Sequence, residues 1–272
     1  MKDNRYQILL TNDDGIQSPG LWAAAEALSA VGYVTIAAPR DQASSTGRSQ
    51  PVTSDGQIIP SSLHIGEQVW TVYAIGGSPA QTVLHGVLDI MPVKPDLVVA
   101  GINYGENIGS GVTVSGTVGA AIEGAAMGIP ALATSLQLLD GDFLSYSRSV
   151  DFSTAAYFTA YFANLILELG LPEDVDLLKL DVPASATPQT PWRITRQARH
   201  RYYIPFLERK ATETEPSRIR FEIAVEPDNV PKGTDVHTLL FDHEVSVTPL
   251  SLDMTSRVDL KVLENNFKKS ES

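Results

Sequence analysis

The stretch "QILLTNDDGI", residues 7–16, joins a short apolar run to an acidic turn, and the interpretation of the whole chain starts from it. Three consecutive apolar residues that end at a turn predict a short buried strand. The turn places two adjacent carboxylates, Asp13 and Asp14, where that strand ends. The stretch therefore predicts a strand that delivers acidic side chains to one edge of a sheet.

Strand and helix patterns alternate along the first two-thirds of the chain. The predicted strands are 6–10, 34–38, 95–101, 129–135 and 177–183, and a hairpin is expected within 50–75. The predicted helices are 20–30, 79–88, 116–128 and 152–169. Strands that are apolar on both faces and alternate with helices indicate a parallel sheet covered on both sides. The predicted fold class is α/β, a Rossmann-like and mostly parallel sheet with helices on both faces.

The pattern changes after about residue 183. Ile219, Phe221, Ile223 and Val225 alternate with polar residues, which predicts an antiparallel strand with one solvated face, and 243–252 predicts another strand. The segment 262–272 predicts a fraying helix and a polar tail. We expect a core at 1–185 that carries the site. Residues 186–272 are expected to form a β-rich C-terminal extension, not an independent domain, that packs on the core or on a neighbouring subunit.

Composition limits the function classes. The chain has 272 residues, 43% of them hydrophobic, and a formal net charge of −12. An acidic surface repels phosphate backbones and anionic lipids, so neither nucleic acid nor a membrane is an expected partner. The absence of cysteine excludes disulfides and thiolate metal sites. The apolar run at the N-terminus is too short for a signal peptide, and we expect a cytoplasmic protein.

Polar side chains follow three of the predicted strands. Asn12, Asp13 and Asp14 follow the first, Ser44 lies in the loop after the second, and the glycine-rich loop "INYGENIGSGVTVSG" carries Asn103 and Asn107. Ligands of open parallel sheets bind beyond the carboxyl ends of the strands. Neighbouring carboxylates need solvent, protons or a cation, and hard divalent ions prefer oxygen ligands. A solvated turn with an aspartate helix cap is the alternative interpretation.

The glycine-rich loop leads directly into a predicted helix. Ser115 or Thr117 would cap its N-terminus, and Gly116 between them leaves backbone N–H groups open to a ligand. A helix N-terminus of this kind favours phosphate. Small residues recur every four positions behind it, which we attribute to close packing of the helix on the sheet.

Several common site motifs are missing from the sequence. The chain has no G-x-G-x-x-G after a strand, no Walker lysine, no G-x-S-x-G and no H-E-x-x-H. Dinucleotide binding, a P-loop, a serine hydrolase and a zinc protease are therefore not indicated.

Seven segments resemble the SurE survival-protein family of metal-dependent nucleotidases, in family order and over nearly the whole chain. They are "TNDDGIQSPG", "APRDQASSTGRS", "GSPAQTV", "DLVVAGINYGENIG", "SGTVGAAIEGAAMGIPALA", "TRQARHRY" and "SVTPLSLDMT". The resemblance implies one divalent ion per subunit, Mg²⁺ or Mn²⁺. It also implies hydrolysis of nucleoside 5′- and 3′-monophosphates by metal-activated water, and a homodimer or homotetramer built through the C-terminal extension.

The resemblance also implies roles for individual residues. Asp13, Asp14, Ser44 and Asn103 match the family's metal ligands, with Asp13, Asp14 and Asn103 also expected to be catalytic. Phosphate binding is expected from Ser115, Gly116, Thr117, Asn12 and Asn107. Arg48, Gly111 and Val114 depart from the family pattern at positions near these motifs.

Two other functions are compatible with the same residues. One is a polyphosphate or general acid phosphatase that uses the same site. The other is a metal- or nucleotide-binding module without turnover, which would bind Mn²⁺ and nucleotide and release no phosphate.

Overall fold

The computed structural model describes residues 5–65, 68–139, 149–208, 217–223, 225–226 and 229–269. The strands are β1 (Tyr6–Thr11), β2 (Gly32–Pro39), β3 (Ile58–Ile65), β4 (Gln68–Ile75), β5 (Leu97–Tyr104), β6 (Ala131–Leu136), β7 (Leu177–Val182), β8 (Trp192–Ile194), β9 (Tyr203–Leu207), β10 (Ile219–Ile223) and β11 (Val245–Leu250). The helices are α1 (Pro19–Leu28), α2 (Pro79–His85), η1 (Gly86–Ile90), η2 (Gly109–Thr113), α3 (Gly116–Ala126), α4 (Ser153–Leu169), α5 (Asp235–His237), η4 (Thr238–Asp242) and α6 (Leu260–Lys269). Within the described residues, none of the helices combines the length and apolar character that crossing a membrane requires.

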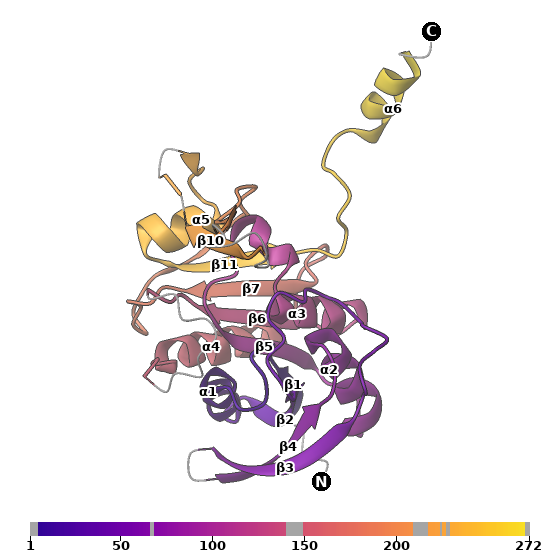
Figure 1. Cartoon of the computed structure of the whole chain (residues 1–272), viewed down its shortest axis with the longest axis vertical. Helices are drawn as coiled ribbons and strands as arrows, with labels where there is room; N and C mark the ends of the chain where they lie inside the picture. The colour runs from indigo at the N-terminus through magenta and orange to yellow at the C-terminus, as the bar shows by residue number, and fades with distance from the viewer. Residues whose placement is uncertain are drawn as a thin grey trace.

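Nine strands of the described chain form one sheet in the order β3-β4-β2-β1-β5-β6-β7-β11-β8. In this order, the six strands β4, β2, β1, β5, β6 and β7 all run parallel to one another. At the two ends of this group, β3 runs antiparallel to β4 and β11 runs antiparallel to β7. Helices α1 and α4 cover one face of the sheet, and α2 and α3 cover the other (Figure 1). The predicted α/β fold class is confirmed.

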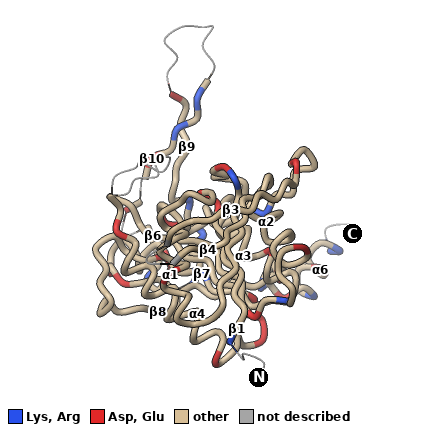
Figure 2. Tube along the Cα trace, turned by 90° about the horizontal axis from the view of Figure 1, so that it is seen from below, with Lys and Arg blue, Asp and Glu red and all other residues tan. Residues whose placement is uncertain are grey.

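The C-terminal third of the chain adds three features to this core. Strand β11 continues the main sheet beside β7, and the short strand β8 pairs with β11 in parallel, which the sequence did not predict. Strands β9 and β10 form a separate antiparallel pair that projects from the body (Figure 2). Helix α6 extends away from the body and buries none of its residues (Figure 1). The domain division at residue 185 stays a prediction, and the predicted tail at 270–272 lies outside the described residues.

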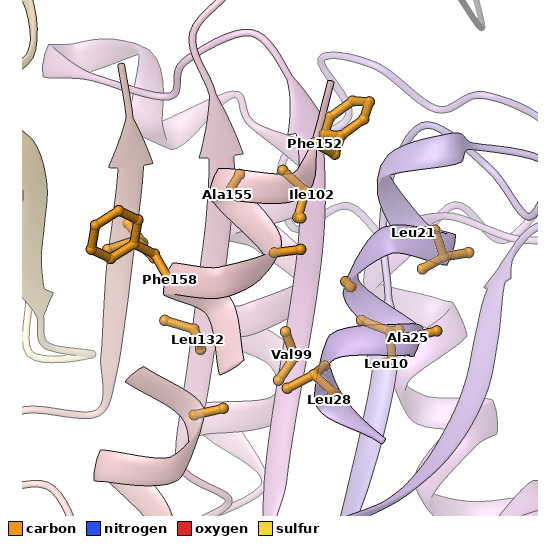
Figure 3. Packing of buried hydrophobic residues seen from close by; sticks show 14 of the residues in the cluster. Leu10, Leu21, Ala25, Leu28, Val99, Ile102, Leu132, Phe152, Ala155 and Phe158 are labelled. Atoms are coloured by element: carbon orange, nitrogen blue, oxygen red, sulfur yellow. The ribbon is translucent and has the colours of Figure 1, made fainter. Parts of the chain in front are cut away.

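Strand β1 shows why the sheet is covered on both faces. Leu9 packs into the cluster under α2 and α3, while Ile8 and Leu10 pack into the cluster under α1 and α4. Successive side chains of a strand point to opposite faces, so an uninterrupted apolar run is buried only between two layers of helices. Figure 3 shows the cluster under α1 and α4, in which side chains of these helices meet the central strands. The figure labels Leu10, Leu21, Ala25, Leu28, Val99, Ile102, Leu132, Phe152, Ala155 and Phe158.

Candidate active site

The polar residues gather where the strand order reverses. From β1 the chain continues outward to β2 on one side of the sheet, and it later returns to place β5 on the other side of β1. Loops that leave neighbouring strands in opposite directions open a crevice at their carboxyl ends, where ligands of doubly wound sheets bind. The NDDG turn follows β1, and Asn103 and Tyr104 end β5, so both border this crevice.

The NDDG turn is held by its own first residue. The Asn12 amide donates to the Gly15 carbonyl at 3.0 Å, and its oxygen accepts from the Gly15 backbone N–H at 3.1 Å. Gly15 has a φ of 96°, a conformation that favours glycine. Asn12 is fully buried, so these contacts give it a role in shaping the turn, and they lend no support to the phosphate contact predicted for it.

Asp13 lies against the first turn of α3. Ser115 is the N-cap of this helix, since its hydroxyl accepts from the Val118 N–H at 3.1 Å. Thr117, the other predicted cap, donates its hydroxyl to Asp13 Oδ1 instead. A Cβ added to Gly116 would lie 2.7 Å from the Asp13 Cβ, so only glycine allows this approach. The predicted SGT turn and the first aspartate therefore lie together.

Asp14 is held by the end of β5 and by the loop after β2. Its carboxylate accepts from the Tyr104 backbone N–H and from Gln42 Nε2, both at 3.2 Å. Beside it, the Asn103 amide nitrogen donates to the Tyr104 carbonyl at 3.2 Å and to the Gly105 carbonyl at 2.7 Å. Both amide hydrogens are used in this way, and the oxygen Oδ1 is the side-chain atom left for a ligand.

The two carboxylates are buried in a way that penalises their charge. Asp13 and Asp14 are 4% and 3% exposed. Burial raises the pKa of Asp13 to about 6, although the Thr117 hydroxyl and nearby backbone N–H groups lower it. Burial and the neighbouring Asp13 charge raise the pKa of Asp14 to about 8. Adjacent buried carboxylates of this kind are stabilised in the charged form by a cation.

The donor set fits a hard divalent cation. Among the described residues, no group of three or more histidine, cysteine, aspartate or glutamate side chains could hold a metal. An ion here would therefore depend on two carboxylates and neutral oxygens, the donors that suit Mg²⁺ and Mn²⁺. Ser44 is exposed, and its loop is held against the turn by the Ala43 N–H, which donates to the Asp13 carbonyl at 2.7 Å.

Comparisons with known proteins identify the family of the chain. The family model described as "Survival protein SurE" matches residues 8–204, which include most of β1, the whole of β2 to β7 and every predicted site residue. The chain belongs to the SurE family.

The SurE relatives align over nearly the whole chain. The "5'-nucleotidase SurE" of Methanocella arvoryzae is 41% identical over 255 residues, covering 92% of this chain and 94% of the relative. That of Thermococcus gammatolerans is 40% identical over 263 residues, covering 95% of each. The crystal structure of the SurE protein from Aquifex aeolicus superposes with a TM-score of 0.75 at 31% identity, covering 98% of this chain and all of that one.

The three departures from the SurE pattern lie around the site. Arg48 donates through Nε to Glu123 Oε2 at 2.6 Å, which connects the loop after β2 to α3. Val114 is 56% exposed, and a Cβ added to Gly111 would meet nothing within 4 Å.

The structure adds a charged cluster that the sequence analysis missed. Lys179 and Asp181 on β7 and Asp235 at the start of α5 are fully buried together. The Lys179 ammonium contacts both carboxylates, and the Asp235 contact is 3.3 Å. Burial alone would lower the pKa of Lys179, but the two carboxylates raise it overall, whereas burial raises the pKa of Asp181.

The sequence carried a signal for this cluster. In "LLKLDVP", Lys179 and Asp181 are two positions apart in an otherwise apolar strand, so their side chains point to the same face of a buried strand. A lysine and an aspartate placed in this way are expected to be paired, since buried charges require partners. The partner from the C-terminal extension, Asp235, could not be predicted from spacing.

Proposed function

We propose that this protein is a divalent-metal-dependent 5′-nucleotidase that hydrolyses nucleoside monophosphates to nucleoside and phosphate. The observation that carries the proposal is the pair of buried carboxylates at the switch point of the sheet, with Asp13 against the first turn of α3 and Asp14 against the end of β5. The curated relatives named as 5′-nucleotidases, at about 40% identity, support the same reaction.

The metal would be Mg²⁺ or Mn²⁺, held by Asp13, Asp14, Ser44 and Asn103. When bound, such an ion polarises a phosphoryl oxygen and makes a water more nucleophilic. The chain itself supplies the fixed positions of the ligands. The Thr117 hydroxyl orients the Asp13 carboxylate, and the Tyr104 N–H orients that of Asp14.

The phosphoryl group would bind at the first turn of α3. Ser115 caps this turn, and the end of the helix at which it lies is the one where the helix dipole favours negative charge. Donors fixed in advance stabilise the charge that develops on phosphoryl oxygens in the transition state. Asn107, in the loop before this helix, would add a side-chain contact; its amide nitrogen donates to Ser135 Oγ at 2.8 Å.

Three further features belong to the proposal. Activity toward 3′-monophosphates is expected at the same site. A homodimer or homotetramer would form through the C-terminal extension, and the protein would act in the cytoplasm.

Phosphate release tests the proposal. A panel of 5′- and 3′-nucleoside monophosphates would be incubated with Mn²⁺, with Mg²⁺ and with EDTA. The wild-type protein would be compared with Asp13→Asn and with the matched variant Asp41→Asn, which changes an exposed aspartate in the neighbouring loop. We expect metal-dependent release that the first variant loses and the second retains.

The other outcomes separate the alternatives. A folded protein that releases phosphate from polyphosphate and from no nucleotide would be the general phosphatase. Binding of Mn²⁺ and nucleotide by calorimetry, without any release of phosphate, would identify a binding module and contradict the proposal.

A further inference from the structure

The buried charged cluster of Lys179, Asp181 and Asp235 holds the glycine-rich loop of the candidate site. The Asn107 backbone N–H donates to Asp181 Oδ1 at 2.8 Å, and the Gly109 backbone N–H donates to Asp235 Oδ2 at 3.1 Å. Lys179 contacts the other oxygen of Asp181 and the same oxygen of Asp235. Two alternate amides of the loop are thus fixed by two carboxylates that share one ammonium.

The C-terminal extension completes this attachment. The second oxygen of Asp235 accepts from the Ala198 and Val236 N–H groups at 2.8 and 2.9 Å. Ile108, between the two anchored amides, packs into a small apolar cluster whose other members come from the extension. The Gln197 amide also donates to the Gly109 carbonyl at 3.0 Å. The loop is therefore held between β7 and the extension.

Lys179 is the component that makes this arrangement possible. Asp181 and Asp235 are both fully buried, and two uncompensated carboxylates at such a place would repel each other without solvent to screen them. An ammonium between them lets both remain acceptors for loop N–H groups. An apolar side chain of similar length would leave the carboxylates unbalanced and would release at least one loop amide.

We propose that Lys179 is a positioning residue for phosphate binding. By balancing the two carboxylates that anchor the Asn107 and Gly109 backbones, it fixes the glycine-rich loop that leads into α3, and with it the Asn107 side chain, whose amide donates to Ser135 Oγ at 2.8 Å. This inference rests on the proposed nucleotidase function, and it gives the C-terminal extension a part in the site in addition to assembly.

The test compares Lys179→Met with Arg193→Met, which also removes a cation from an ion pair, here the pair between the exposed Arg193 on β8 and Glu244. Amide hydrogen exchange would be followed across the chain. We expect faster exchange at residues 105–110 in the first variant, with β1, β5 and α3 still protected, and no change in the second. In the phosphate-release assay, kcat/KM is expected to fall by up to about 100-fold, because small displacements of binding groups have effects of this size.

Two further variants distinguish positioning from general stability. In an Asn107→Ala background, Lys179→Met is expected to have a much smaller effect on kcat/KM, because both changes act through the same contact. Combining Lys179→Met with Asp181→Asn removes one positive and one negative charge. The side-chain amide introduced at position 181 can still accept from the Asn107 backbone N–H and can donate to the Asp235 carboxylate. This double variant is expected to recover loop protection and most of the activity.

Several results would overturn the proposal. One is normal loop exchange and normal kcat/KM in Lys179→Met, and another is exchange that rises equally throughout the sheet. If this variant does not fold, the double variant decides. Folding with a protected loop then supports the proposal, and failure to fold or an unprotected loop overturns it. A wild-type protein without nucleotidase activity would contradict the proposed function alone, because the exchange measurement does not need activity.

Discussion

Asp13 and Asp14 are neighbours in sequence, yet different elements hold them. Asp13 is bound by the first turn of α3 and Asp14 by the end of β5. The pKa of both is raised above the ordinary 3.8 because burial disfavours the charged form. A protein normally avoids such an arrangement, and its presence at a ligand-binding edge of the sheet is typical of a functional site.

The raised pKa values predict how the stability of the metal-free protein changes with pH. The folded state binds protons at Asp13 and Asp14 more tightly than the unfolded state does. This contribution to stability is fully present below about pH 3.8, and it is lost as the pH rises through the folded-state pKa values of about 6 and about 8. In EDTA, we expect the free energy of unfolding to fall over this range, measured by urea denaturation. Asp14→Asn should reduce the fall, and Mn²⁺ should stabilise the wild type more at pH 8 than at pH 5. Identical pH dependence in the variant and the wild type would contradict the assignment.

Thr117 provides a second test at the level of single residues. Thr117→Val keeps the shape of the side chain but removes the hydrogen bond to Asp13. We expect a loss of about 1 to 3 kcal/mol in unfolding free energy, as for hydrogen bonds to charged groups. Mn²⁺ affinity, measured by calorimetry, should fall about 10- to 100-fold, as it does when the partner of a metal ligand is lost. Thr159→Val removes a similar bond to the Ala155 carbonyl in α4, and it should leave Mn²⁺ affinity unchanged.

At the scale of elements, the site depends on how closely α3 approaches the loop after β2. The Gly47 N–H donates to the Val114 carbonyl at 3.0 Å, and Gly119 faces the Gly47 backbone directly. The sequence analysis attributed the small residues at 116, 120, 124 and 128 to packing of this helix on the sheet, and the last of them lies beyond the end of α3. Gly124 does pack on Val98 of the sheet, but the contact of Gly119 with a loop follows no periodicity.

Gly119→Ala tests this approach. Alanine favours helices over glycine by about 1 kcal/mol, but its Cβ would lie 2.3 Å from the Gly47 carbonyl oxygen, so the backbone must move. We expect a net loss of about 1 to 3 kcal/mol in unfolding free energy, together with weaker Mn²⁺ binding because the loop carries Ser44. Gly111→Ala meets nothing within 4 Å and should stay within about 0.5 kcal/mol of the wild type. Equal effects of the two substitutions would contradict the structure.

The elements of the core could be predicted because their signals are local. The apolar runs of β1, β5, β6 and β7 and the glycine-rich loop before α3 lie close to their predicted bounds. What could not be predicted depends on contacts between distant segments. The pairing of β8 with β11 and the contact of Asp235 with Lys179 join residues that no sequence pattern relates.

At the scale of the whole molecule, the acidic core contrasts with the parts that extend from it. The apolar residues predicted to form one face of β10 are exposed in the single chain, among them Ile219 and Phe221. Helix α6 carries three lysines and one glutamate in a protein of net charge −12, and all of its side chains are exposed. Exposed apolar residues beside basic ones would suit contact with a second, acidic copy of the chain, which stays part of the proposal.

Helix α6 makes the oligomer testable. Leu260, Leu263 and Phe267 are spaced three and four residues apart, so they share one face of the helix, and all are exposed. We expect Leu263→Glu combined with Phe267→Glu to lower the mass measured by light scattering by half or more, because charge on this face would oppose burial in a partner. Asn265→Glu adds one such charge to the opposite face and should leave the mass unchanged. Since α6 buries none of its residues in its own chain, the thermal stability of an isolated subunit should not depend on either change. Equal masses for the wild type and both variants would show that assembly does not use this helix.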